Sequence, residues 1–232
     1  MEALELGPSR PITRRELGWA VLLTGVVAWL YVLVFKIDFS GPLFGFSDTP
    51  IWYMAGDFFR TNLHWWPWPH LEPMTERYMY PYGPTVGLYQ PFAFERDILV
   101  SLAIRVGGVG PWVQAYFVGA LSVTLLGGYL IMRQGYARAG SAAVALLVAF
   151  GNAFVLDRYP VQIGPAVASW LLLMILLDHV MLRQLWCEKR VVVRLVGVRI
   201  LLAGLAVGLE LGYYTGFSFM INLAALVGWG VC

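Results

Sequence analysis

The chain alternates long apolar runs with short polar segments, and the runs have the length of membrane-spanning helices. An α-helix needs roughly 20 apolar residues to cross a bilayer. The final run is too long for one span, and we expect it to divide at the Gly-Tyr-Tyr-Thr-Gly sequence of residues 212–216. The pattern therefore predicts an all-α integral membrane protein with about six transmembrane helices. The runs, the last of which divides, are residues 18–35, 111–132, 141–156, 163–182 and 200–231.

The first run reads as a membrane anchor. Residues 1–17 are polar and carry three arginines. The run that follows exceeds the 7–15 residues usual for the apolar part of a signal peptide, and no small-residue cleavage site comes after it. We expect a cytoplasmic N-terminal segment over 1–17 and a single polytopic membrane domain over 18–232.

Composition strengthens this interpretation. Hydrophobic residues make up 59% of the chain, charged residues 13%, and the mean hydropathy is +0.68. A water-soluble domain is near 45–50% apolar and about 25% charged, so this chain lacks the polar surface that water requires. The net charge of +2 gives no reason to expect a nucleic-acid partner; the expected partners are membrane lipids.

The basic stretches indicate an orientation. The N-terminus, the Arg-Gln-Gly-Tyr-Ala-Arg sequence at 133–138 and the stretch 183–199 are separated by even numbers of predicted spans. They therefore share one side, which the positive-inside rule places in the cytoplasm. The connections at 36–110, 157–162 and near 212–216 are then outside. We expect a multi-pass protein of a bacterial inner membrane, with its N-terminus in the cytoplasm.

The outer segment 36–110 is aromatic and begins a predicted helix. Ser47-Asp48-Thr49-Pro50 has the residues of a helix start, because the polar side chains cap free amides and proline fits the first turn. The following apolar residues repeat at helical spacing and predict a short helix lying on the membrane surface, with Asp57 and Arg60 on its wetter side. These apolar residues are Ile51, Met54, Ala55, Phe58 and Phe59.

Two prolines within residues 64–70 end that helix. A second apolar stretch begins at Tyr82-Gly83-Pro84 and is bounded by the charged residues 95–97. It is too short to span, so we expect a re-entrant or interfacial helix. Non-helical backbone at this depth must be buried in protein or line a cavity, which predicts a pocket near the outer membrane surface.

The order of these elements resembles a known family. A first span, the Ser-Asp-Thr-Pro helix and the Tyr-Pro-Tyr-Gly-Pro-Thr-Val-Gly-Leu-Tyr-Gln-Pro-Phe-Ala stretch at 80–93 precede paired spans. This resembles the N-terminal half of the GT-C glycosyltransferases, especially the polyprenyl-phosphate-mannose-dependent mannosyltransferases. The specific part is residues 47–94. The resemblance implies sugar transfer from a polyprenyl-phosphate donor on the extracytoplasmic face, without a cofactor.

The resemblance also implies site residues. Asp48 matches the family's catalytic acidic residue and would act as general base toward an acceptor hydroxyl. The alternative is a purely structural role, in which Asp48 caps the N-terminus of the helix. Tyr53 falls at the family's aromatic position. Arg158 would face the donor phosphate, and Gln162 lies where the family often has a Gly-Gln pair.

Three further residues belong to the predicted substrate site. Tyr80 and Tyr82 would stack on sugar rings, although interfacial anchoring explains them equally well. Glu210 lies within an apolar run, where ionisable groups are costly and often functional. The Glu210 carboxylate would either bind a ligand or transfer a proton, or it would form a structural ion pair with Arg158. The family usually has a lysine near this position.

The histidines do not predict a metal site. His64 and His70 flank Trp-Trp-Pro-Trp-Pro with no carboxylate at ligand spacing, and His179 falls on the opposite side of the membrane. We interpret Asp178-His179 as a wet helix terminus.

A second function class also fits the sequence. The chain would be a non-catalytic, GT-C-like subunit of a larger membrane assembly, such as an energy-transducing complex, and its aromatic outer segment would pack against other membrane subunits.

Overall fold

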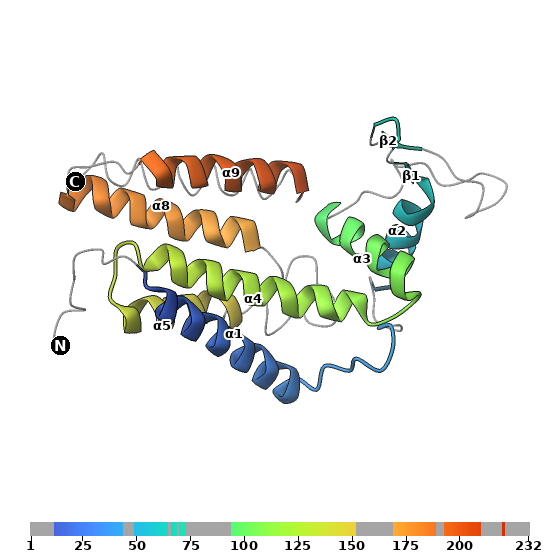
Figure 1. Ribbon diagram of the computed structural model, residues 1–232, viewed down its shortest axis with the longest axis horizontal. Coiled ribbons are helices and arrows are strands. Elements are labelled where there is room, and N and C mark those ends of the chain that lie inside the picture. Colours follow the sequence, from blue (N-terminus) through green and yellow to red (C-terminus); the bar gives the residue numbers. More distant parts are fainter. Residues whose placement is uncertain are drawn as a thin grey trace.

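A bundle of helices with a cap at one end makes up the described part of the chain. The computed structural model describes residues 12–43, 49–64, 66–68, 70–72, 94–151, 169–188, 193–209 and 220. Five helices lie roughly side by side (Figure 1). They are α1 (Arg14–Val34), α4 (Trp112–Met132), α5 (Arg138–Phe150), α8 (Ser169–Glu188) and α9 (Val193–Leu209).

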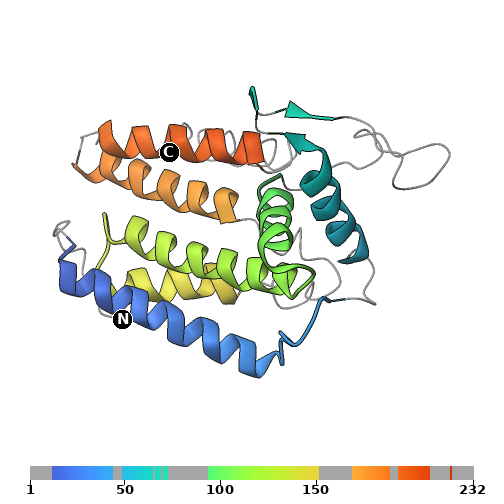
Figure 2. The ribbon, with the colours of Figure 1, turned by 45° about the vertical axis from the view of Figure 1, so that its right-hand side comes forward.

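The cap consists of two shorter helices and a hairpin. Helices α2 (Thr49–Asn62) and α3 (Phe94–Gly107) lie across one end of the bundle, and the hairpin projects beyond them (Figure 2). The hairpin strands are β1 (Leu63–His64) and β2 (His70–Leu71). We call this end of the bundle the cap end, and the end with the α4–α5 connection the turn end.

Two of the described helices, α1 and α4, are long and apolar enough to cross a membrane, with 21 residues each. The helices predicted over 18–35 and 111–132 are therefore confirmed. Helix α1 begins before its apolar run, because the Thr13 hydroxyl accepts a hydrogen bond from the Glu16 amide at 3.1 Å and caps the first turn. Helix α5 ends at Phe150, and residues 152–168 lie outside the described part. The six-span topology stays a prediction.

Helix α1 presents apolar side chains outward along most of its length. Trp19, Leu23, Trp29 and Val34 are each more than half exposed. Its inner side touches α4, where Tyr31 is buried. A helix this apolar on its outer face is typical of one surrounded by lipid rather than by water.

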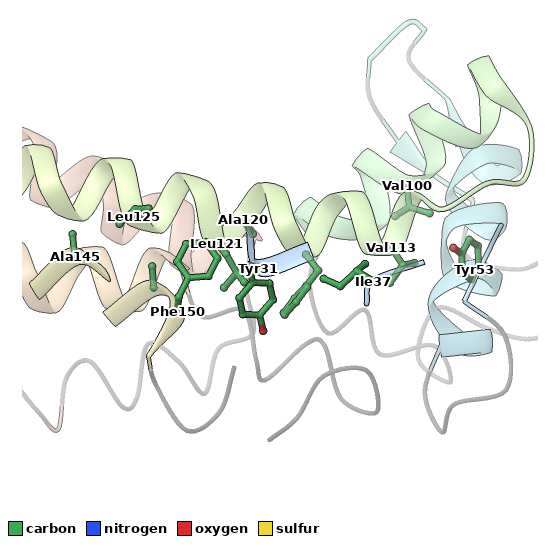
Figure 3. Close-up of a cluster of buried hydrophobic side chains, with 12 residues drawn as sticks. Tyr31, Ile37, Tyr53, Val100, Val113, Ala120, Leu121, Leu125, Ala145 and Phe150 are labelled. Carbon is green, nitrogen blue, oxygen red and sulfur yellow. The ribbon is translucent and has the colours of Figure 1, made fainter. Parts of the chain in front are cut away.

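Helix α4 is the central element of the bundle. It contacts α1, α5 and α8 along its length and both cap helices near its start. Val113, Phe117 and Leu121 recur at four-residue spacing on its buried side. They meet Tyr31 of α1 and Phe150 of α5 in one apolar cluster (Figure 3).

Small and hydroxyl residues bring α4 close to α8. A Cβ atom on Gly127 would lie 3.0 Å from the side chain of Leu173, and one on Gly128 would lie 3.1 Å from Leu176. The Thr124 hydroxyl donates a hydrogen bond of 2.7 Å to the Ser169 hydroxyl. The small residues let the two helices approach closely, and the hydrogen bond between the hydroxyls joins α4 to α8.

A buried ion pair joins α1 to α4 at the turn end. The Glu16 carboxylate accepts hydrogen bonds from Arg133 Nε at 2.6 Å, the Tyr129 hydroxyl at 2.8 Å and Arg138 Nη2 at 3.1 Å. The side chains of Glu16 and Arg133 are only 6% and 7% exposed. The hydrogen bond that Arg133 donates to Glu16 raises the pKa of the Arg133 guanidinium.

The basic segments share this end, as predicted. Arg183 Nη1 of α8 donates a hydrogen bond to the Gly135 carbonyl in the α4–α5 turn. Gln184 Nε2 donates to the Gln134 carbonyl at 3.3 Å. Together with Glu16, these contacts gather the described parts of all three basic stretches at the turn end.

Most of the basic stretch 183–199 is helical in the structure. Helix α8 continues to Glu188 and α9 begins at Val193. Within these helices, Arg183 and Arg199 find partners on neighbouring elements.

Asp178-His179 is likewise not a helix terminus, because both residues lie in the middle of α8. Asp178 Oδ1 accepts a hydrogen bond of 2.7 Å from Arg199 Nε of α9, and the His179 ring stacks on Tyr136.

The Glu16 ion pair generates a stability prediction. Glu16→Gln removes the charge that balances buried Arg133, and we expect the free energy of unfolding to fall by about 3 kcal/mol. Unfolding in a denaturing-detergent titration measures the change. Arg14→Gln, which removes an exposed cation of the same helix, is the control. Equal stability of the two variants would contradict a structural role for the pair.

Candidate functional site

The predicted site surrounds the start of α2, which the structure places at the cap end. The helix begins at Thr49 with Pro50 in its first turn, so the predicted helix start is confirmed. Asp48 precedes this helix in the sequence and lies outside the described residues. Its roles as N-cap and general base stay predictions.

The apolar face of α2 packs against α3. Ala55, Phe58 and Phe59 are buried, and a Cβ atom on Gly56 would lie 2.7 Å from Val100 Cγ1. The prediction that this face rests on the membrane surface is therefore wrong. The sequence pattern did not predict α3, because the charged residues 95–97 lie in its first turn. Without α3, the apolar face of α2 had only the membrane to pack against.

The wetter side of α2 is as predicted. Arg60 and Asp57 form an ion pair of 2.6 Å, and their side chains are 32% and 26% exposed. The Arg60 carbonyl accepts a hydrogen bond from Arg105 Nη2 of α3 at 2.7 Å. This contact joins the C-terminal turns of the two cap helices.

The first turn of α3 buries an ion pair. Arg96 and Asp97, which bound the predicted apolar stretch in the sequence, are 1% and 0% exposed. Arg96 donates to Asp97 Oδ1 through Nε at 2.9 Å and Nη2 at 2.7 Å. Burial raises the pKa of Asp97, and the neighbouring guanidinium opposes that rise. Mutual neutralisation allows both residues to enter the cap interior.

Tyr53 connects α2 to α4 through its hydroxyl. The hydroxyl donates a hydrogen bond of 2.9 Å to the Gly110 carbonyl and lies 3.3 Å from Gln114 Oε1. Gln114 Nε2 donates in turn to the carbonyls of Asp38 at 3.0 Å and Gly41 at 2.9 Å, in the segment that follows α1. We call these contacts the Tyr53–Gln114 network.

The network lies inside the protein. Tyr53 is 7% exposed and Gln114 1%, and burial raises the pKa of the Tyr53 hydroxyl. The ring lies at the edge of the apolar cluster near Val113 (Figure 3). The hydroxyl is already bonded within the protein, so in this structure Tyr53 positions α2. Its predicted contact with a substrate stays a prediction.

The remaining predicted site residues lie outside the described part of the chain. Their placement relative to Tyr53 therefore stays a prediction. They are Tyr80, Tyr82, Arg158, Gln162 and Glu210.

Gln114 is the positioning residue that sequence reasoning missed. It is a polar residue within the apolar run 111–132. A buried polar group requires a hydrogen-bond partner, so its place in that run was the signal that could have identified it.

The hairpin presents tryptophans to the outside. His64 pairs with His70 across the two strands, and the imidazole rings stack with centroids 5.2 Å apart. Trp66 and Trp68, in the connection between the strands, are 86% and 73% exposed. The hairpin thus displays an aromatic tip beyond α2.

The return strand also brings a carboxylate to the histidines, which their spacing had not indicated. Glu72 Oε1 lies 3.4 Å from His64 Nε2. Among the described residues, no group of three or more histidine, cysteine, aspartate or glutamate side chains is placed to hold a metal ion.

Comparisons of the chain with models of protein families, with curated proteins and with solved structures find no match. The assignment of the site therefore rests on the chain's own residues and on the geometry of the cap.

The Tyr53–Gln114 network generates a second prediction. Tyr53→Phe removes the hydroxyl and leaves buried acceptors at Gly110 and Gln114, which costs about 1 kcal/mol. We expect faster amide hydrogen exchange in α2, measured by mass spectrometry. The control is Tyr136→Phe at the turn end, which removes a hydroxyl that contacts His179. It should leave α2 unchanged, and equal exchange in α2 of both variants would contradict the role of the network.

Proposed function

We propose that this chain is a multi-pass integral membrane protein whose cap end faces the extracytoplasmic side. Two observations support the proposal: the outward apolar face of α1, and the basic segments that meet at the turn end. The positive-inside rule assigns that end to the cytoplasm. A bacterial inner membrane fits this arrangement.

At the cap end, we propose that the protein transfers a sugar from a polyprenyl-phosphate donor. The observation that carries this proposal is the Tyr53–Gln114 network, which fixes α2 to the end of the spanning helix α4. The fixed helix begins next to Asp48 in the sequence. A catalytic carboxylate needs such a fixed position relative to the lipid headgroup, because small displacements of a general base sharply reduce the rate.

The proposed step uses Asp48 as general base. Its carboxylate takes the proton of an acceptor hydroxyl as the hydroxyl oxygen bonds to the anomeric carbon of the sugar. The bond between that carbon and the polyprenyl phosphate breaks, and the lipid phosphate leaves with the electron pair. Arg158 would balance the phosphate charge.

The other predicted residues would hold the substrate. Tyr80 and Tyr82 would stack on the sugar, and Gln162 and Glu210 would form hydrogen bonds with it.

A matched pair of variants on one helix tests the catalytic role. Asp48→Asn keeps the shape of the side chain but cannot accept a proton, so we expect transfer to fall by at least about 100-fold. The assay follows transfer of a labelled sugar from a polyprenyl-phosphate donor in proteoliposomes. The control is Asp57→Asn, which removes a partly exposed carboxylate of α2 and should leave transfer unchanged. Full activity of Asp48→Asn would exclude the assigned role.

A second candidate function has its own observation. The exposed tryptophans of the hairpin, Trp66 and Trp68, are of the residue type most enriched at protein interfaces. A non-catalytic subunit of a larger membrane assembly, energy-transducing or otherwise, would use this tip to contact another membrane subunit.

Trimming the hairpin tests the subunit function. In Trp66→Ala/Trp68→Ala we expect stoichiometric partners to be lost, because the exposed aromatic contacts are removed while the bundle is untouched. Mass spectrometry of complexes purified in mild detergent gives the measurement. Trp29→Ala, which trims an exposed tryptophan of α1, is the control. Recovery of the unaltered protein without protein partners would contradict this function.

A further inference from the structure

A groove opens between α1, α4 and α5 at the turn end, far from the cap. Its volume is about 830 Å³, within the range of about 300–1,000 Å³ typical of small-molecule sites. Trp19 and Leu23, on the α1 wall, are 54% and 57% exposed, so the groove is open along its side. Its apolar lining includes Ala20, Leu23, Val27, Leu125, Ala142 and Leu146.

The depth of the groove matches one leaflet of a bilayer. Along α1, its lining extends from Arg15 to Val27, about 18 Å at 1.5 Å per residue. Half of the hydrocarbon core of a bilayer is roughly 15 Å. The groove therefore begins at the level of the basic residues and ends near the middle of the membrane, as an acyl chain does.

The mouth of the groove is positively charged. Arg15 and Arg138 line it, and the Arg138 side chain is 70% exposed. Among the described residues that line the groove, the one carboxylate, Glu16, is bound by Arg133 at 2.6 Å as well as by Arg138 at 3.1 Å. These two cations offset the Glu16 charge, and Arg15 adds a further positive charge, so an incoming anion meets a net positive site.

We propose that this groove binds an anionic phospholipid of the cytoplasmic leaflet. The phosphate lies between Arg15 and Arg138, and one acyl chain lies in the groove against Leu23 and Ala142. The two arginines favour an anionic headgroup over a neutral one, since arginine clusters at the cytoplasmic surface attract anionic lipids. The long apolar groove favours a lipid over a free anion, because a free anion has no acyl chain to fill it. This inference rests on the proposed membrane embedding and orientation, and it is independent of sugar transfer.

Native mass spectrometry of the full chain, purified from mixed micelles, tests the site. The probes are phosphatidylglycerol and phosphatidylcholine with identical acyl chains. We expect the protein to retain phosphatidylglycerol in preference to phosphatidylcholine. Arg15→Gln and Arg138→Gln should each weaken phosphatidylglycerol binding about fivefold. Ala142→Phe should abolish retention, because its ring fills the groove.

Matched controls separate the site from general effects. Arg194→Gln removes an exposed cation of α9, and Ala143→Phe adds a ring at the exposed position of α5 next to Ala142; neither should change retention. Arg15→Gln keeps the test valid if Arg138→Gln disturbs the contact with Glu16.

Three results would overturn the inference: equal retention of the two lipids, unchanged retention by Ala142→Phe, and binding of inorganic phosphate with no lipid retained. Release of the protein from membranes by alkaline carbonate would overturn the embedding and this inference together. Transfer is measured separately with Asp48→Asn, so a lack of transfer would leave the lipid site standing.

Discussion

The arrangement of the described helices depends on α4. This helix contributes Phe117 to one apolar cluster and Met132 to a second cluster with Leu173 and Leu177 of α8, and it carries a buried polar contact near each end. Gln114 joins its start to α2 and to the segment after α1. Arg133, directly after its last residue, joins it to Glu16 of α1. Apolar contacts alone would permit α1 and α2 to slide along α4. The polar contacts fix their positions, since a buried polar group displaced from its partner loses its hydrogen bond at a cost of about 1–3 kcal/mol.

The same polar contacts give the two ends of the bundle different surfaces. At the cap end they place a short helix, an aromatic hairpin and a buried ion pair on top of the bundle. At the turn end they neutralise Glu16 and leave cations at the mouth of an apolar groove. The proposed sugar transfer and the proposed lipid site therefore belong to opposite membrane faces, joined by α4.

The sequence pattern identified the helices whose apolar residues form a continuous run or a regular repeat. The helices predicted at 18–35 and 111–132 are continuous apolar runs, and α2 has a periodic apolar face after a Ser-Asp-Thr-Pro sequence, so local composition was sufficient for them. It failed where charged residues are paired inside the structure. Because Arg96 and Asp97 are charged, the start of α3 was not predicted. The basic residues between Arg183 and Arg199 likewise prevented prediction of the end of α8 and the start of α9. An ion pair offsets part of the cost of burying a charge, and the sequence does not state where the partner lies.

The sequence by itself determined that the chain is largely helical, that it has apolar runs of spanning length, and that its described basic segments lie at one end. Each of these follows from composition and periodicity along a short stretch of chain. Only the tertiary structure decided that α3 covers the apolar face of α2, that Tyr53 and Gln114 anchor the cap, and that Glu16 faces Arg133. These contacts join residues as much as 117 positions apart, and they form because buried polar and apolar groups must find partners in three dimensions.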